Sequence, residues 1–203
     1  MTEQKDTYKT IDLPAQGEFF KDRGSKFYGY TYPIFDESEV KPIIELLKKE
    51  HHTARHWCYA WQIGESYQNY RVNDDGEPSN SAGMPIFGQL QSYDVTNILV
   101  VVVRYFGGTK LGIGGLMQAY KTAAKMSLES STIVQKTIDQ NFLLQFEYPE
   151  MNIVMRVIKE EKLTILNQTM QLNCEFKIAV RKKNAGRIFD LFDKTHKVCI
   201  KKA

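Results

Sequence analysis

The sequence predicts an α+β protein of two domains, one over residues 1–138 and one over residues 139–203. Two observations support this prediction. In the second part, apolar runs follow the order strand, helix, strand, strand, helix, strand. In the first part, the β-branched run Ile98–Val103 leads into a glycine-rich segment and then into a helical pattern. A chain of 203 residues can bury an adequate core in either arrangement.

The first domain opens with a predicted hairpin. Residues 18–34 are rich in Phe and Tyr and alternate imperfectly, with a turn expected at 22–25. A helix should follow, because Asp36 and Glu39 have the spacing of a capping box. One apolar stripe on that helix contains Val40, Ile43, Ile44 and Leu47.

The middle of the chain holds two predicted strands and a long polar segment. Trp57–Ile63 has strand character, and Ile98–Val103 has the continuous apolar composition of a strand covered on both faces. Residues 64–83 are polar and too long for a simple connector, so they are a candidate functional segment. We expect a short helix at 84–90 and a strand or linker at 131–140. The helix after the glycine-rich segment carries Leu116, Ala119, Tyr120, Ala123 and Ala124 on one side.

The second domain has the clearer pattern. Pro149 stands where the first helix should begin, and Asn184 where the second helix should be capped. The order βαββαβ is that of the split-βαβ, ferredoxin-like unit. Its strands are predicted at 142–148, 163–170, 172–180 and 197–201.

The amino-acid composition excludes several classes of protein. No run approaches the roughly 18 apolar residues that cross a bilayer, and the segment 1–6 lacks the apolar core of a secretory signal. The three cysteines, Cys58, Cys174 and Cys199, are odd in number and widely spaced, which argues against a disulfide framework or a zinc site. We therefore expect a cytoplasmic protein with no membrane partner.

The net charge of +3 is too small to indicate nucleic acid by itself, but its distribution is uneven. Residues 141–203 carry a net charge of +5 and residues 1–140 carry −2. The second domain could therefore contact a polyanion, or it could simply have a solvated basic face. The densest basic positions are Arg181, Lys182, Lys183, Lys197, Lys201 and Lys202.

The glycine-rich segment 104–115 is the most informative motif. A glycine-rich loop leading into a helix leaves backbone N–H groups free at the positive end of the helix dipole, which favours anions. The segment fits no nucleotide motif, because Lys110 precedes Leu111 where a Walker loop needs Ser or Thr, and Met117 stands where the dinucleotide fingerprint needs glycine. The alternative is that the glycines allow close helix–sheet packing. The residues expected to contact phosphate or RNA are Arg104, Tyr105, Gly107, Gly108, Lys110, Gly112, Gly114 and Gly115.

Three carboxylates, Asp74, Asp75 and Glu77, lie within four residues of the polar segment. They could hold Mg²⁺ or act in acid–base chemistry, but Asp-Gly and Glu-Pro are also ordinary turn formers. We favour a structured loop and predict neither a metal site nor a cofactor. The candidate groove residues are His56, Asp74, Asp75, Glu77 and Ser79.

A histidine-rich segment precedes the strand at 57–63. His52 and His56 are four residues apart, but the glutamate of a zincin helix is missing. Cys58 near His56 raises the question of a nucleophile. We expect neighbouring strand residues to point to opposite faces, so that His56 does not activate Cys58.

Four segments together resemble the YigZ/IMPACT family. Two are long and unusual in composition, so the resemblance is specific, and it covers about residues 17–130. This sequence departs from the usual family pattern at two places. Asn80-Ser81 stands where Gly-Thr is common in the family, and Gln118 stands where Arg is common. The segments are Gly24-Ser25-Lys26-Phe27, Ala54-Arg55-His56-Trp57-Cys58-Tyr59-Ala60, Asp74-Asp75-Gly76-Glu77-Pro78-Ser79 with Ala82-Gly83-Met84-Pro85, and Val103 to Leu116.

This resemblance implies a first domain of the βαβ type found in a small-subunit ribosomal protein and in elongation factor G domain four. It implies a second, ferredoxin-like domain similar to domain five of that factor. Eukaryotic members are translation regulators that carry a different accessory domain, so their protein partners are not transferred. For the bacterial branch the resemblance implies no catalytic reaction.

The leading hypothesis is an RNA- or ribosome-associated protein that regulates translation and binds phosphates through the glycine-rich loop and the basic second domain. Exposed aromatic residues such as Tyr105 could stack on bases. The alternative is an enzyme acting on a nucleotide or a small phosphorylated ligand. A third hypothesis is a protein partner bound by the sheet of the second domain.

Overall fold

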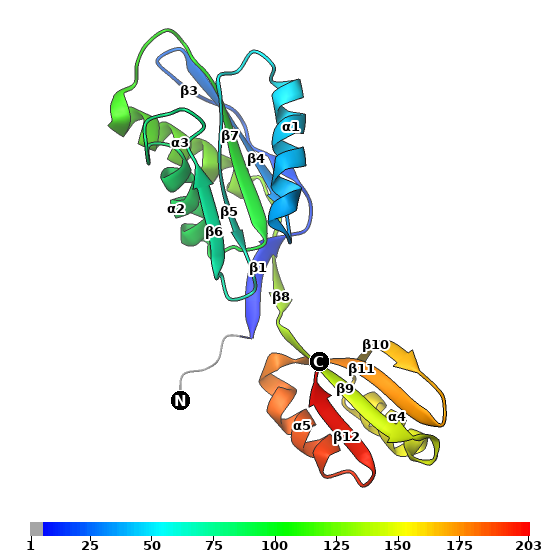
Figure 1. Cartoon of the computed structure of the whole chain (residues 1–203). Coiled ribbons are helices and arrows are strands. Elements are labelled where there is room, and N and C mark those ends of the chain that lie inside the picture. The colour runs from blue at the N-terminus through cyan, green and yellow to red at the C-terminus, as the bar shows by residue number, and fades with distance from the viewer. Residues whose placement is uncertain (1–5) are drawn as a thin grey trace. The chain divides into compact units, whose positions relative to one another are not determined.

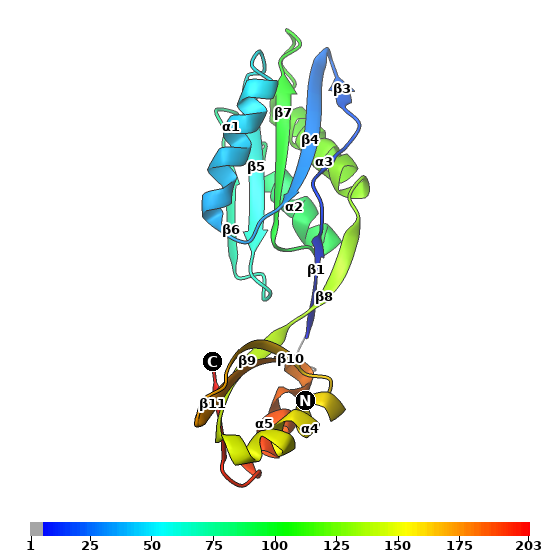
Figure 2. The same ribbon diagram turned by 90° about the vertical axis from the view of Figure 1, so that its right-hand side faces the viewer.

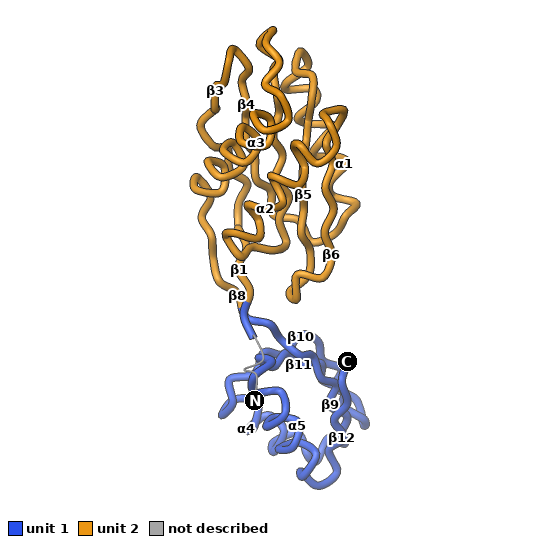
Figure 3. The backbone as a smooth tube through the Cα atoms, turned by 90° about the vertical axis from the view of Figure 1, so that its left-hand side faces the viewer, with its two compact units in different colours: residues 1–7, 137–203 blue, residues 8–136 orange. Residues whose placement is uncertain are grey.

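The computed structural model describes residues 6–203, which form two compact units. The larger unit comprises residues 8–136, and the smaller one combines Asp6 and Thr7 with residues 137–203 (Figure 3). The sequence predicts the boundary after residue 138, whereas the structure divides the chain after residue 136. The predicted absence of a secretory signal falls mostly on residues 1–5, outside the described range. Within residues 6–203, no helix is both long and apolar enough to cross a membrane.

The larger unit is built on a six-stranded antiparallel sheet with β7 near its centre. The order is β2-β4-β7-β5-β6, and β3 pairs with β4 in the predicted hairpin. Residues 98–104 of β7 are buried, which confirms the prediction of a strand covered on both faces. The strands are β2 (Ala15–Gln16), β3 (Phe20–Asp22), β4 (Ser25–Pro33), β5 (His56–Ile63), β6 (Asn69–Asn73) and β7 (Ile98–Tyr105).

Helices cover both faces of this sheet (Figures 1 and 2). α1 (Val40–Glu50) packs on one face with Val101 and Val103, and α2 (Gly83–Tyr93) and α3 (Gly112–Glu129) pack on the other with Val100 and Val102. Alternate residues of β7 therefore belong to different cores. Before α1, the short helix η1 (Glu37–Glu39) has the predicted Asp36–Glu39 capping box.

Two elements differ from their predictions. The polar segment 64–83 contains the strand β6, which the sequence does not indicate because its residues are mostly exposed at the edge of the sheet. The helix expected at 84–90 extends over Gly83–Tyr93.

The two ends of the larger unit are joined by their own short sheet. β1 (Thr7–Ile11) pairs with β8 (Ile133–Thr137), which lies in the segment predicted as a strand or linker. Just beyond these strands, the Ile138 N–H donates to the Asp6 carbonyl at 2.8 Å. The chain therefore enters and leaves residues 8–136 at neighbouring positions.

The smaller unit confirms the ferredoxin-like prediction. Its antiparallel sheet has the order β10-β11-β9-β12, and both helices pack against one core. Pro149 lies in a short helix, η2 (Tyr148–Glu150), that precedes α4. Asn184 occupies the N-cap position of α5, but its side chain makes no capping hydrogen bond. The elements are β9 (Asp139–Glu147), α4 (Met151–Glu160), β10 (Thr164–Thr169), β11 (Asn173–Arg181), η3 (Lys182–Asn184), α5 (Ala185–Asp193) and β12 (Val198–Lys202).

Candidate functional site

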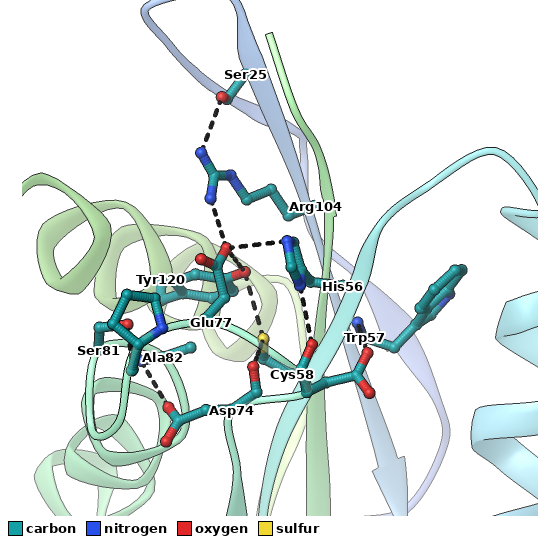
Figure 4. Close-up of polar contacts among 12 residues, drawn as sticks. Ser25, His56, Trp57, Cys58, Asp74, Glu77, Ser81, Ala82, Arg104 and Tyr120 are labelled. Atoms are coloured by element: carbon teal, nitrogen blue, oxygen red, sulfur yellow. Dashed lines mark hydrogen bonds and ion pairs between the residues drawn. The ribbon is translucent and has the colours of Figure 1, made fainter. Parts of the chain in front are cut away.

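A buried polar network surrounds the carboxylate of Glu77, in the loop between β6 and α2 (Figure 4). Its Oε1 accepts from Arg104 Nη1 at 2.5 Å and from the Tyr120 hydroxyl at 2.8 Å, and His56 Nε2 lies 3.8 Å away. Burial raises the pKa of Tyr120 well above its usual range, so the hydroxyl stays protonated and donates. One carboxylate thus ties the loop to β7, α3 and β5.

Arg104 is committed to this network. Its side chain and that of Glu77 are each only 5% exposed, so the two charges neutralise each other inside the fold. Its Nη2 also donates to Ser25 Oγ at 3.3 Å, and the guanidinium carbon lies 5.5 Å from the ring centroids of Phe27 and Phe106. The expectation that Arg104 offers a free positive charge to a ligand is therefore corrected. The sequence does not indicate this ion pair because the partner, Glu77, is 27 residues away along the chain.

The other two carboxylates stabilise the backbone. Asp74 Oδ1 accepts from the N–H groups of Ala82 and Gly83 at 2.9 and 2.8 Å, which caps the start of α2. Asp75 Oδ2 accepts from the Trp57 N–H at 2.6 Å. The carboxylates of Asp74, Asp75 and Glu77 thus bind different groups and do not converge on one site. Ser79, also a predicted groove residue, is exposed in the same loop. Among residues 6–203, no group of three or more His, Cys, Asp or Glu side chains could hold a metal ion.

Cys58 and His56 do not lie on opposite faces of the sheet, contrary to the prediction from the sequence. His56 and Cys58 are two residues apart in β5, so they point to the same face of the sheet, not to opposite faces. The Cys58 thiol donates to the Asp74 carbonyl at 3.0 Å and contacts the Tyr120 hydroxyl at 3.3 Å. Burial raises the pKa of Cys58 well above its usual range, which disfavours the nucleophilic thiolate.

The glycines of the glycine-rich segment have different roles. A Cβ on Gly107 would lie 1.9 Å from the Gly24 carbonyl carbon, so this position needs glycine for close packing of the hairpin. Gly108 and Gly112 have φ angles of +88° and +73°, which other residues rarely adopt. At Gly114 a Cβ would meet nothing within 4 Å. Gly107 thus packs against the hairpin turn at Gly24 and not between helix and sheet as the alternative expected, and the helix start at Gly112 and Gly114 stays open.

The start of α3 is exposed and has no side-chain cap. The N-cap residue, Leu111, makes no side-chain capping bond, and the first turn holds no acidic residue. Gly112, Ile113 and Gly114 are exposed, and Lys110 is exposed just before them. Uncapped N–H groups at a helix start carry partial positive charge, which Lys110 reinforces.

A pocket of about 310 Å³ joins the glycine-rich segment to the acidic loop. It brings together four predicted site residues: Glu77, Arg104, Lys110 and Gly112. The expectation that Tyr105 takes part is corrected: it follows Arg104 in β7 and faces the α1 side, where its hydroxyl lies 2.8 Å from His51 Nδ1. Five further lining residues are apolar, and sequence reasoning did not single them out: Pro78, Phe106, Leu111, Ile113 and Leu116.

A larger groove of about 930 Å³ runs between α2 and α3 and begins at Gly114. Its ionisable side chains, apart from Tyr93, are Lys121 and Lys125. Lys125 is 3.6 Å from Glu129 at the end of the helix, whereas Lys121 is exposed. The exposed side of α3 therefore carries positive charge beyond its first turn.

Comparison with known proteins identifies relatives. The Impact N-terminal domain matches residues 23–128. The IMPACT family member YvyE of Bacillus subtilis is 30% identical over 180 residues, which is 89% of this chain and 82% of that protein. The IMPACT family member YigZ of Escherichia coli is 35% identical over 143 residues, or 70% of each chain.

A solved structure extends the likeness to both units. A crystal structure described as a hypothetical protein has a TM-score of 0.75 and 27% identity, and the match covers 98% of each chain. The matched domain includes β4 to α3 and hence the Glu77 network and the glycine-rich segment. From the domain match and these relatives, the chain belongs to the IMPACT family.

Proposed function

We propose that the protein binds RNA, free or on the ribosome, and thereby regulates translation. The observation that carries the proposal is the exposed, uncapped start of α3 beside Lys110. A phosphate accepts hydrogen bonds from backbone N–H groups at a helix start without any dedicated side chain. The role in translation is carried over from the resemblance noted in the sequence, which implies eukaryotic members that are translation regulators.

The lysines of α3 extend the proposed contact along the helix. Lys110 precedes the helix, and Lys121 and Lys125 line the groove beyond it. Polyanion binding depends mainly on such cations, because each phosphate that they neutralise releases condensed counterions. Arg104 has a different role in this proposal: its bond to Glu77 positions the acidic loop beside the helix start.

The smaller unit offers a separate basic surface. On the sheet face away from its core, Lys177 of β11 and Lys201 of β12 both pair in register with Leu143 of β9. Both lysines are exposed, and Glu175 is a nearby carboxylate on the same face. We propose that this face adds phosphate contacts. If pull-downs of partner proteins survive nuclease treatment and depend on Lys177 and Lys201, this sheet binds protein instead.

Salt-dependent RNA binding tests the proposal. For short single-stranded RNA, the slope of log K against log salt should become shallower by about 0.7 for each lost phosphate contact. The variant Lys110→Ala with Lys121→Ala should therefore bind more weakly and with a shallower slope. Lys41→Ala is the matched control, because Lys41 is an exposed lysine on α1, across the sheet. Equal binding by the double variant and the wild type would refute this assignment of residues.

The alternative, an enzyme acting on a nucleotide or small phosphorylated ligand, has less support from the geometry. Both carboxylate oxygens of Asp74 accept backbone N–H groups, and Asp75 binds the Trp57 N–H. Cys58 is buried with a raised pKa. A thermal-shift panel of nucleotides with and without Mg²⁺ tests this alternative, and a large metal-dependent shift would favour it over RNA binding.

A further inference from the structure

The pocket between Glu77 and α3 has a composition that phosphate binding alone does not need. Apolar side chains form most of its walls, and two of them are well exposed: Phe106 at 42% and Ile113 at 61%. Both line the pocket together with Gly112, the first residue of α3. A phosphate would use the N–H groups and Lys110 and would leave the apolar walls in water. The pocket therefore fits a ligand with a flat apolar part next to its phosphate.

A second observation comes from Arg104, which lines the same pocket. Its Nη1 and Nη2 bond Glu77 and Ser25, but its buried Nε has no hydrogen-bond partner among the described residues. Buried donors are normally satisfied, so an unpartnered one calls for an explanation. The fold therefore leaves one donor unsatisfied at a residue that lines the pocket.

We infer that this pocket holds one unpaired nucleobase of an RNA strand, while the adjoining phosphate lies at the start of α3. The inference rests on the proposed function and specifies the form of RNA that is bound. Unpaired bases stack on aromatic side chains, and Phe106 offers a half-exposed ring with the Arg104 guanidinium 5.5 Å from its centroid. A volume of about 310 Å³ is at the lower end for ligand pockets, which suits a single base. Bases in a duplex are paired and stacked, so they cannot enter.

Three RNA probes of equal length test the inference: a single strand, its duplex, and an abasic strand that keeps only ribose and phosphate. The wild-type protein should bind the single strand about 10-fold more tightly than the other two, as expected for the loss of one stacked base. Phe106→Ala should lower affinity for the single strand to the abasic level and leave abasic binding unchanged. Phe35→Ala is the control, because Phe35 is also exposed but lies beside η1, away from the pocket. Tryptophan fluorescence would confirm that both variants are folded.

The outcomes separate this inference from the proposed function. If the abasic strand binds as tightly as the single strand and still depends on Lys110, the base pocket is refuted and phosphate binding stands. If none of the probes binds at low salt, both proposals fail. A nucleoside monophosphate that competes as tightly as the strand would overturn the assignment to RNA and indicate a free nucleotide.

Discussion

Removing the Glu77 carboxylate should strongly destabilise the larger unit. In Glu77→Ala the Arg104 guanidinium stays buried with Ser25 as its remaining partner, and the Tyr120 hydroxyl loses its acceptor. Leaving one charge of a buried pair uncompensated costs about 3–5 kcal/mol of unfolding free energy. With a urea m-value of about 2 kcal/mol/M, the unfolding midpoint should fall by about 2 M.

Urea titration followed by tryptophan fluorescence measures this loss in the full chain. Trp57 and Trp61 are the only two tryptophans, and both lie in β5, so the signal reports on the larger unit alone. Glu37→Ala is the matched control. The Glu37 Oε1 and Arg71 Nη1 atoms are also 2.5 Å apart, but the two side chains are 55% and 58% exposed instead of buried. That variant should lose at most about 1 kcal/mol.

A double variant completes the test of the buried pair. Glu77→Leu with Arg104→Met removes both charges and should be more stable than Glu77→Ala, because no unpaired charge remains buried. If Glu77→Ala loses no more stability than Glu37→Ala, the ion pair does not hold the acidic loop in place. The positioning role assigned to Arg104 would then be wrong.

Two further predictions concern single positions. Gly107→Ala should destabilise the larger unit severely, because its Cβ would lie 1.9 Å from the Gly24 carbonyl carbon. Gly114→Ala should be neutral or stabilise α3 by up to about 1 kcal/mol, because a Cβ there meets no atom within 4 Å. Equal urea midpoints for the two variants would contradict this prediction. In a thiol-reagent assay at pH 8, the exposed Cys199 should react rapidly and Cys58 only after unfolding, because its raised pKa keeps the thiol protonated. Rapid reaction of Cys58 in the folded Cys199→Ser variant would show that the thiol is accessible.

The sequence predicts most of the fold because the elements are locally encoded. The strand predicted at 172–180, where apolar side chains alternate with polar ones, depends on residues within one strand, and the capping box at Asp36 and Glu39 depends on residues within one turn. β6 is missed because an exposed edge strand does not require an apolar pattern. Periodicity therefore identifies most elements that bury a face, but not β1, which is only five residues long although its Tyr8 and Ile11 are buried.

The site is harder to predict because its interactions join residues that are distant in sequence. Asp74 caps a helix from eight and nine residues away, and Glu77 binds Arg104 from 27 residues away. The sequence places Arg104 and Tyr105 together in one motif, but β7 is apolar on both faces, so its composition does not indicate which side each residue takes. Lys110 and the open helix start are predictable because they depend on local chain geometry.

The pairing of β1 with β8 makes residues 8–136 an insert whose two ends are neighbours. A segment closed in this way can be cut out, re-joined at new termini or fused to another protein with little rearrangement of its own core. The junction beside Asp6 and Ile138 is thus a natural point for exchanging one appended module for another.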